Sequence, residues 1–506
     1  MAETLNESFD LKQIQDFKGK YPKQLWFLFF SEMWERFCFY GMRGMLTYFM
    51  VYQMLMDKSV ANLQYRATQA WVYAFTFLGG LFADKILGFR ISLFWGGLLM
   101  ITGSILLMIS PTDFFFTGIS FVIIGTGFFK PNISSMVGQL YKADDHRRDA
   151  GFSPFYSGIN IGAFLGGILM IGVGKGEILS NAIPEHLRWN VAFGLVAVVM
   201  TISLLTFALN HKKLGSIGLS PFKPEQNKKA KTYQWMVYIG ALACIPLIQI
   251  MVANTVYTDY FMAIIGPFSL IYLFYEMTKL EKKDNLKLVA ALIFIIFSVV
   301  FWAIFEQAGG SLSIYAAEHL KKDLVGLPID PNMVNNSGNA MFVIFFAPLI
   351  GLLWLWLHKR KLEPNSVVKF GLGFLFLGIG FYTFFTNKFF SDAAGMTSLN
   401  LFTFGYLIIT FGEIALSPIG LSLMTKLSTQ KLQGVMMGMW FLASAYGQYV
   451  AGLFGSAITP DDSASAVEKL ATYSEGYKQF GIYAIIAGVI LIVISPMVRK
   501  LMGEVK

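Results

Sequence analysis

The sequence predicts an all-α protein that crosses a membrane many times, and three observations support this fold class. Hydrophobic residues make up 55% of the 506 residues and charged residues only 14%, whereas soluble domains carry about 25% charged residues. Apolar stretches of roughly 20 residues, the length of one helical crossing, follow one another along the chain. The polar residues between them form short loops that contain most of the lysine and arginine. Such a chain cannot make a water-soluble surface, so we expect a polytopic membrane protein.

Fourteen stretches are long and apolar enough to form transmembrane helices. Six precede the longest basic linker, residues 211–231, which contains two prolines and is typical of a boundary between two halves. Two stretches without a mid-helix charge follow the linker, and six more follow these two. The fourteen predicted helices lie near residues 25–55, 68–83, 91–110, 114–140, 151–173, 189–209, 233–253, 259–277, 288–317, 340–357, 368–386, 399–424, 435–458 and 477–497.

This order predicts two bundles of six helices with two additional helices between them. Paired six-helix halves are a common plan among transporters, with the binding site at the interface of the halves. The predicted segments are an N-terminal segment 1–24, an N-terminal bundle 25–210, a linker 211–232, the two additional helices 233–286 and a C-terminal bundle 287–506.

The basic residues predict the orientation of the chain in the membrane. With the N-terminus in the cytoplasm, 28 of the 40 lysines and arginines fall in cytoplasmic segments, as the positive-inside rule requires. Because they are spread over short loops, the net charge of +9 does not indicate a nucleic-acid partner. The first 24 residues are polar and mixed in charge, so we expect no cleaved signal. Short outer loops favour a bacterial inner membrane, with both termini in the cytoplasm.

The first predicted helix carries four charges where a bilayer tolerates few. Glu32, Glu35, Arg36 and Arg43 share an arc of about 100° on a helical projection, so we expect one polar stripe that faces inward. A charge at the bilayer centre costs about 2.5 to 3.5 kcal/mol on insertion scales, so each charge needs a partner, a cavity or a function. The alternative is a purely structural ladder, because Glu32 and Arg36 form an i,i+4 pair.

Three further charges interrupt apolar helices. Lys130 lies before Pro131, and its alternative role is to snorkel to the membrane interface. Glu306 and Glu413 each lack an opposite charge nearby in the sequence, so we expect distant partners in the other half, which is how a gate could form. The seven buried charges sum to −1, and one bound proton neutralises them.

The motif from Glu32 to Gly41, EMWERFCFYG, resembles the E-x-x-E-R-F-x-Y-Y-G signature of the proton-coupled oligopeptide transporters, a family of the major facilitator superfamily. Phe39 departs from the signature, which removes one hydroxyl and keeps the aromatic ring. The segments GGLFADKILGFR, GTGFFKPN and FSPFYSGINIGAF are similar to superfamily and family motifs of the N-terminal bundle. In the second half, FWAIFEQ, GEIALSPIGLSLMTKL and MMGMWFLASA are similar to the family's seventh, tenth and eleventh helices. The resemblance spans nearly the whole chain and implies the major facilitator fold.

The resemblance also implies a mechanism, proton-coupled import of di- and tripeptides by alternating access. Proton coupling would involve the carboxylates Glu32, Glu35 and Glu306. A gate would form where Arg43 and Lys130 reach Glu306.

The implied peptide site recognises the two charged ends of a peptide. These ends are about 5 to 7 Å apart in a short extended chain. A cavity with opposite charges at its two ends would therefore bind the peptide backbone independently of the identity of the side chains. Tyr73 and Trp440 have core packing as the alternative role, and Asn160 has helix packing. The substrate-binding residues implied by the resemblance are Arg36, Tyr40, Arg43, Tyr73, Lys130, Asn160, Trp302, Asn339, Glu413 and Trp440.

Other functions remain as alternatives. A relative that transports nitrate or another small anion would share the fold, although the carboxylates favour a substrate with an amino group. A membrane enzyme would need a nucleophile with its base or a metal cluster, and the sequence contains no such grouping. A sensor would normally carry an added soluble domain. We expect no metal and no cofactor, with the proton as the coupling ion.

Overall fold

The structure, a computed structural model, describes residues 11–142, 147–221, 229–429 and 432–504. Parts of the predicted segments 1–24 and 211–232, namely residues 1–10 and 222–228, lie outside the described residues. Within the described residues the chain forms helices and short loops, with two isolated β-bridges and no strand. Eleven of its helical segments are long and apolar enough to cross a membrane. The predicted all-α polytopic fold class is therefore confirmed.

Each of the fourteen predicted spans overlaps a helix of at least 21 residues in the described part of the chain. These helices are α2 (Gln24–Tyr52), α3 (Lys58–Phe82), α4 (Phe89–Ile109), α5 (Phe115–Gln139), α6 (Arg147–Lys175), α7 (Arg188–Asn210), α8 (Ala230–Ala253), α9 (Thr255–Met277), α10 (Lys282–Phe305), α12 (Pro331–Lys359), α13 (Ser366–Thr386), α14 (Leu399–Leu427), α15 (Gln433–Ala457) and α16 (Ala466–Met502).

The structure corrects one predicted span. The span near 288–317 is not one continuous helix, because α10 ends at Phe305 and a 3₁₀ turn, Glu306–Gly309, separates it from the short α11 (Ser311–His319). The carbonyl groups freed by this break find side-chain donors: Asn335 Nδ2 lies 2.7 Å from the oxygen of Ala308, and the Thr47 hydroxyl donates to that of Gly309. An interrupted helix is tolerated at membrane depth when the freed backbone groups are paired in this way.

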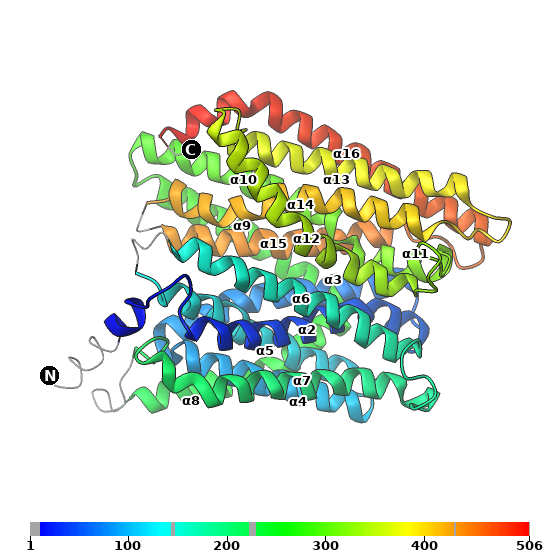
Figure 1. Cartoon of the computed structure of the whole chain (residues 1–506), viewed down its shortest axis with the longest axis horizontal. Coiled ribbons are helices and arrows are strands. Elements are labelled where there is room, and N and C mark those ends of the chain that lie inside the picture. Colours follow the sequence, from blue (N-terminus) through cyan, green and yellow to red (C-terminus); the bar gives the residue numbers. More distant parts are fainter. Residues whose placement is uncertain (1–10, 143–146, 222–228, 430–431, 505–506) are drawn as a thin grey trace. The chain divides into compact units, whose positions relative to one another are not determined.

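The chain divides into two compact units. The first comprises Met1–Met45 and Trp71–Ala253, and the second Leu46–Ala70 and Asn254–Lys506. In the first unit α4 packs along α5 and α7, and in the second α13 packs along α14 and α16, as Figure 1 shows for α13 and α16. The last turns of α2 and the first turns of α3 therefore belong to the second unit.

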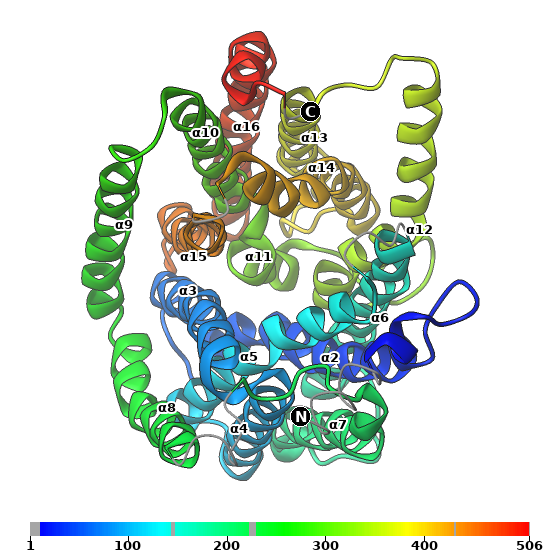
Figure 2. The same cartoon turned by 90° about the vertical axis from the view of Figure 1, so that its left-hand side faces the viewer.

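The two additional helices belong to different units. In the first unit α8 packs against α5. In the second, α9 packs against α15, and the two helices lie side by side in Figure 2. A partly buried ion pair holds α9 to this unit: Arg66 Nη2 of α3 lies 2.7 Å from Asp259 Oδ1, and the hydroxyl of Tyr449 in α15 donates to the same oxygen at 2.8 Å.

Glycines in α6 bring its backbone close to the charged helix α2. A Cβ at Gly162 would collide with the carbonyl oxygen of Met33, and a Cβ at Gly166 with that of Phe37. Small residues allow helix backbones to approach closely in membranes. Within the first unit α6 thus covers α2 beside its charged stripe.

Candidate functional site

The charged stripe of α2 forms a compact cluster of two carboxylates and one guanidinium. Arg36 Nε lies 2.7 Å from Glu32 Oε1 and 3.0 Å from Glu35 Oε2. The three residues are 2%, 1% and 0% exposed, respectively. A structural i,i+4 pair would need only Glu32 with Arg36, and the second carboxylate leaves the cluster with one net negative charge. A buried charge without full compensation is costly, so this arrangement favours a group that takes up a proton or a cation.

Two cations lie against one aromatic ring beside this cluster. Lys130 Nζ of α5 lies 4.4 Å from the ring centroid of Tyr73 and 5.4 Å from that of Phe39. Arg36 Cζ lies 5.9 Å from the Phe39 centroid. Cations are attracted to the face of an aromatic ring, so Phe39 fulfils this role without the hydroxyl of the signature tyrosine. Lys130 is half-buried against these rings, which argues against simple snorkelling.

Arg43 lies further along the same helix. Its Cζ is 6.0 Å from the ring centroid of Tyr40, and both side chains are half-buried. Seven residues separate Arg43 from Arg36, which corresponds to a rise of about 10 Å. The first unit therefore presents Arg36, Lys130 and Arg43 as three cations, each of them close to a buried carboxylate or an aromatic ring.

Asn160 is buried in α6, and its side-chain amide donates to the carbonyl oxygen of Tyr156 in the same helix at 3.0 Å. This bond within its own helix is compatible with the packing role that was the alternative for this residue. Its predicted contact with a peptide stays a prediction.

The second unit contains a separate acidic site. Asn339 Nδ2 of α12 lies 2.8 Å from Glu413 Oε2 of α14 and 3.1 Å from the Thr410 hydroxyl. Two of the substrate-binding residues implied by the resemblance are thus in direct contact. The amide orients the carboxylate, and the half-buried position of Glu413 leaves part of it accessible.

A chain of hydrogen bonds extends from this acidic site to the break after α10. Thr410 donates to the carbonyl oxygen of Tyr406 at 2.7 Å, the Tyr406 hydroxyl donates to Asn335 Oδ1 at 2.6 Å, and Asn335 donates to the oxygen of Ala308. The sequence analysis missed Thr410, Tyr406 and Asn335. Their spacing was a usable signal, because Tyr406, Thr410 and Glu413 repeat at i, i+4 and i+7 on one helix face.

Glu306 opens the 3₁₀ turn after α10 and is 6% exposed. Trp302, one turn earlier, is half-buried and packs against Gly447 of α15. Trp440 is 6% exposed and packs against Gly420 of α14. Glu306 belongs to the second unit whereas Arg43 and Lys130 belong to the first, so the predicted pairing between them stays a prediction.

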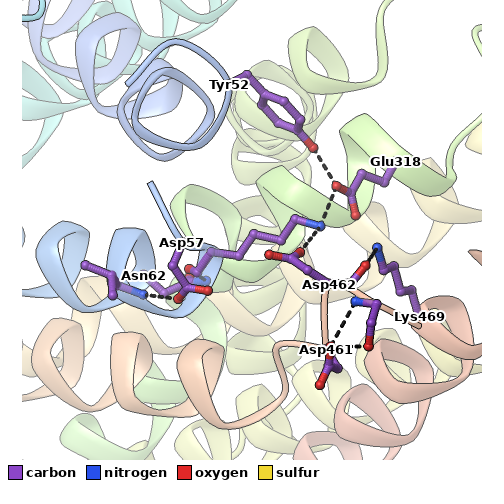
Figure 3. A network of polar contacts seen from close by, with 10 residues as sticks. Tyr52, Asp57, Asn62, Glu318, Asp461, Asp462 and Lys469 are labelled. Carbon is purple, nitrogen blue, oxygen red and sulfur yellow. Dashed lines mark hydrogen bonds and ion pairs between the residues drawn. The ribbon is translucent and has the colours of Figure 1, made fainter. Parts of the chain in front are cut away.

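The sequence analysis also missed a polar network in the second unit, shown in Figure 3. Lys58 Nζ, at the start of α3, lies 2.8 Å from Glu318 Oε1 at the end of α11 and 3.3 Å from Asp462 Oδ1 in the loop before α16. The Tyr52 hydroxyl donates to Glu318 Oε1 at 2.8 Å, and Lys469 Nζ donates to the carbonyl oxygen of Asp462 at 2.8 Å. The network joins the end of α2 and the start of α3 to α11 and α16. No nearby sequence spacing indicates it.

Among the described residues, no three His, Cys, Asp or Glu side chains are placed to hold a metal ion together. The charged clusters consist of carboxylates with cations and amides. This chemistry suits a zwitterion and a proton.

Comparison with known proteins gives consistent results. The model of the POT family matches residues 90–470. The chain is 32% identical to the peptide transporter YePEPT of Yersinia enterocolitica, with 96% of each chain covered, and 31% identical to a di-/tripeptide transporter of Lactococcus lactis, with 96% of this chain and 97% of the relative covered. A crystal structure of a peptide transporter in complex with alafosfalin has a TM-score of 0.80 and 30% sequence identity, and 99% of both chains is covered.

Proposed function

Because this chain belongs to the POT family, we propose that it is a proton-coupled symporter that imports di- and tripeptides by alternating access. Members of this family are transporters, so the chain is a transporter and not an enzyme. The observation that carries the proposal is the buried cluster of Glu32, Glu35 and Arg36 with its net negative charge. One proton would neutralise this cluster. Glu32 alone would compensate the charge of Arg36, so a purely structural ion pair would not require Glu35.

The peptide would be held by its two charged ends. Arg36 and Lys130, with Arg43 further along α2, would take the carboxylate. Glu413 would take the ammonium group, because its carboxylate is already oriented by Asn339 at 2.8 Å, and Asn160 would add an amide contact. Charge-assisted hydrogen bonds of this kind are the strong ones. The side-chain pockets would be lined by Tyr40, Tyr73, Trp302 and Trp440.

Proton uptake would change the partners of Arg36. While both carboxylates are ionised, Arg36 Nε is shared between Glu32 and Glu35. A proton on Glu35 removes one of these attractions, so the guanidinium turns more readily to a peptide carboxylate. Release of the peptide then favours loss of the proton, which couples the two fluxes. No metal or other cofactor takes part in this scheme.

The gate would combine the predicted contact of Glu306 with Arg43 and Lys130 and the network of Lys58 with Glu318. We place the N- and C-termini in the cytoplasm of a bacterial cell, so Lys58 lies on the outer side. The lipid bilayer would surround the helices, and nucleic acid would have no role.

Uptake into proteoliposomes tests the proposal. An imposed inward proton gradient should drive accumulation of labelled di- and tripeptides, and an ionophore that collapses the gradient should abolish it. Nitrate offered in the same vesicles should not accumulate, because Glu413 repels an anion. Gradient-driven nitrate uptake without peptide uptake would replace this proposal with the anion alternative.

A further inference from the structure

The first unit contains a half-open pocket that the transport mechanism does not use. Its volume is about 490 Å³, and it lies between the first turns of α2 and the end of α7 with the 3₁₀ turn His211–Leu214 that follows. Ser31 of α2 and Ser203 of α7 bond to each other's carbonyl oxygens nearby, which fixes the two helices together.

The pocket has a cationic end and an aromatic end. Lys23 and Lys213 line the first, and Trp26, Phe27 and Phe30 line the second. All described residues that line it are basic, polar uncharged or aromatic, and none is acidic. Seven residues separate Lys23 from Phe30, a rise of about 10 Å, which exceeds the roughly 5 to 8 Å depth of one headgroup layer. The pocket therefore extends from headgroup level into the hydrocarbon.

The aromatic walls are exposed where a lipid chain would lie. Trp26 and Phe30 are each 45% exposed, whereas Phe27 is 8% exposed and forms the floor against Phe207. A tryptophan at the membrane interface is common and needs no pocket. Here the tryptophan borders a concave site with two lysines, which is a more specific arrangement.

The two walls are held in place by hydrogen bonds. Gln24 Nε2 of α2 lies 3.2 Å from the carbonyl oxygen of Lys213, and Lys213 Nζ donates to Asn210 Oδ1 at 2.7 Å. An ammonium group has three donors, so Lys213 retains donors for an anion. Basic pockets between transmembrane helices on the cytoplasmic side are suited to anionic lipid headgroups.

We propose that this pocket binds one anionic phospholipid. Its phosphate lies between Lys23 and Lys213, and one acyl chain lies along Trp26 and Phe30. A soluble anion would gain nothing from the exposed aromatic wall, and a neutral lipid would gain nothing from the lysines. The site is independent of the proposed peptide transport, because none of its lining residues belongs to the charged clusters.

Native mass spectrometry of the full chain tests the proposal. Phosphatidylglycerol and phosphatidylcholine with identical acyl chains are titrated against the wild type and against the double variant Lys23→Gln with Lys213→Gln. Each lysine contributes roughly fivefold to binding of an anionic headgroup, so we expect the double variant to lose about 25-fold in phosphatidylglycerol affinity and to keep its phosphatidylcholine affinity.

The matched control is Lys20→Gln with Lys212→Gln, which removes the same charge from neighbouring exposed positions outside the pocket. This control should bind phosphatidylglycerol like the wild type. An equal loss in both double variants would overturn the site, because the effect would then be surface charge alone. Unchanged affinity in the pocket variant would also overturn it.

The apolar wall is tested by Trp26→Ala, which should weaken binding of both lipids, and Trp26→Phe, which should restore it. Inorganic phosphate serves as the competitor. If it displaces phosphatidylglycerol from the wild type, the pocket binds soluble anions and the lipid proposal fails. Thermal unfolding in detergent checks that each variant is folded.

Discussion

At the scale of single residues, Arg36 is the centre of the proposed proton site because two carboxylates compete for one guanidinium. Glu32 and Glu35 are both within 3.0 Å of its Nε. Removing one partner from a buried ion pair normally costs about 3 to 5 kcal/mol, since a charge is left without compensation. In this cluster one negative charge is in excess, so neutralising one carboxylate relieves repulsion.

Replacing Glu35 with glutamine keeps the shape of the side chain and removes its proton-exchanging group. We expect Glu35→Gln to reduce gradient-driven dipeptide uptake to background, because no proton is released at this position. Counterflow of peptide across vesicles at equal pH should persist at least in part, because exchange needs no net proton release.

Glu185→Gln is the control, because Glu185 is exposed at the start of the 3₁₀ turn Glu185–Leu187 before α7. Wild-type uptake by Glu35→Gln would exclude Glu35 from coupling. Loss of counterflow in a variant that still folds and binds peptide would do the same.

We predict that Glu413 binds the ammonium group at the amino end of a peptide. Hydrogen bonds to a charged group contribute about 1.5 to 3 kcal/mol, so Glu413→Ala should raise the half-saturating concentration of a free dipeptide by roughly 10- to 100-fold. Competition by the N-acetylated dipeptide should change little. Equal competition by free and N-acetylated dipeptides in the wild type would contradict this role of Glu413.

At the scale of helices, close backbone contact between α2 and α6 positions the charged cluster. The carbonyl oxygen of Met33 occupies the space that a side chain at Gly162 would need, and the next atoms are the Phe37 backbone nitrogen at 2.9 Å and Arg36 Cβ at 3.0 Å. Even one methyl group at Gly162 therefore forces the two helices apart. The glycine sets the distance at which α6 covers Arg36.

Gly162→Ala should lower the free energy of unfolding by about 1 to 3 kcal/mol, the usual cost of overpacking. Gly240→Ala in α8 is the matched control, because a Cβ there meets nothing within 4 Å. Alanine also favours a helix over glycine by about 1 kcal/mol, so the control should be neutral or stabilising. Thermal unfolding in detergent measures the stability of both variants. A melting temperature of Gly162→Ala equal to that of the wild type would show that α2 and α6 can move apart without a loss of stability.

From the ion pair of Arg66 with Asp259, we expect α9 to be held to its unit mainly near its start. Arg66 is buried, and its Cζ also lies 4.5 Å from the ring centroid of Tyr449. The Asp259 side chain is 39% exposed, so solvent screens part of the attraction and we expect Asp259→Asn to cost only about 1 to 2 kcal/mol. Hydrogen exchange should increase at the start of α9. Unchanged exchange there would show that apolar packing alone retains the helix.

At the scale of the whole molecule, the proposed alternating access needs contacts that differ between two states. Residues 46–70 continue α2 and lead into α3, yet they belong to the second unit. The network of Tyr52, Lys58 and Glu318 supplies specific contacts there. In the proposed gate, opening of the outer side would break such contacts, and their free energy would contribute to the population of each state.

Glu306→Gln should favour the outward-open state, because it removes the charge that would attract Arg43 and Lys130. Spin labels at the outer ends of α2 and α11, placed after replacement of Cys38 and Cys244, report the distance between these ends. We expect longer distances in the variant and in the wild type under acidic conditions. Identical distributions in both proteins from about pH 5 to about pH 8 would exclude Glu306 as a gate residue.

The sequence by itself determined the fold class and one face of the site. Length and hydropathy are local properties, so all fourteen spans could be placed on helices. The helical period likewise grouped Glu32, Glu35 and Arg36 on one face, and the structure joins them within 3.0 Å. The resemblance then named Asn339 and Glu413 as substrate-binding residues, and the structure places them in direct contact, which no periodicity indicates.

Only the tertiary structure decided the helix break at Glu306–Gly309, the division of α8 and α9 between units and the network around Lys58. Tyr52 and Glu318 are 266 residues apart in the chain. Each lies at the end of a helix, where a polar residue is ordinary, so the local sequence does not mark either one. The helix break is stable because Thr47 and Asn335 satisfy the freed carbonyl groups, and neither lies nearby in the sequence. Polar side chains that are distant in the sequence form hydrogen bonds only when the packing of apolar helices brings them within hydrogen-bond distance. Local sequence patterns do not predict that distance.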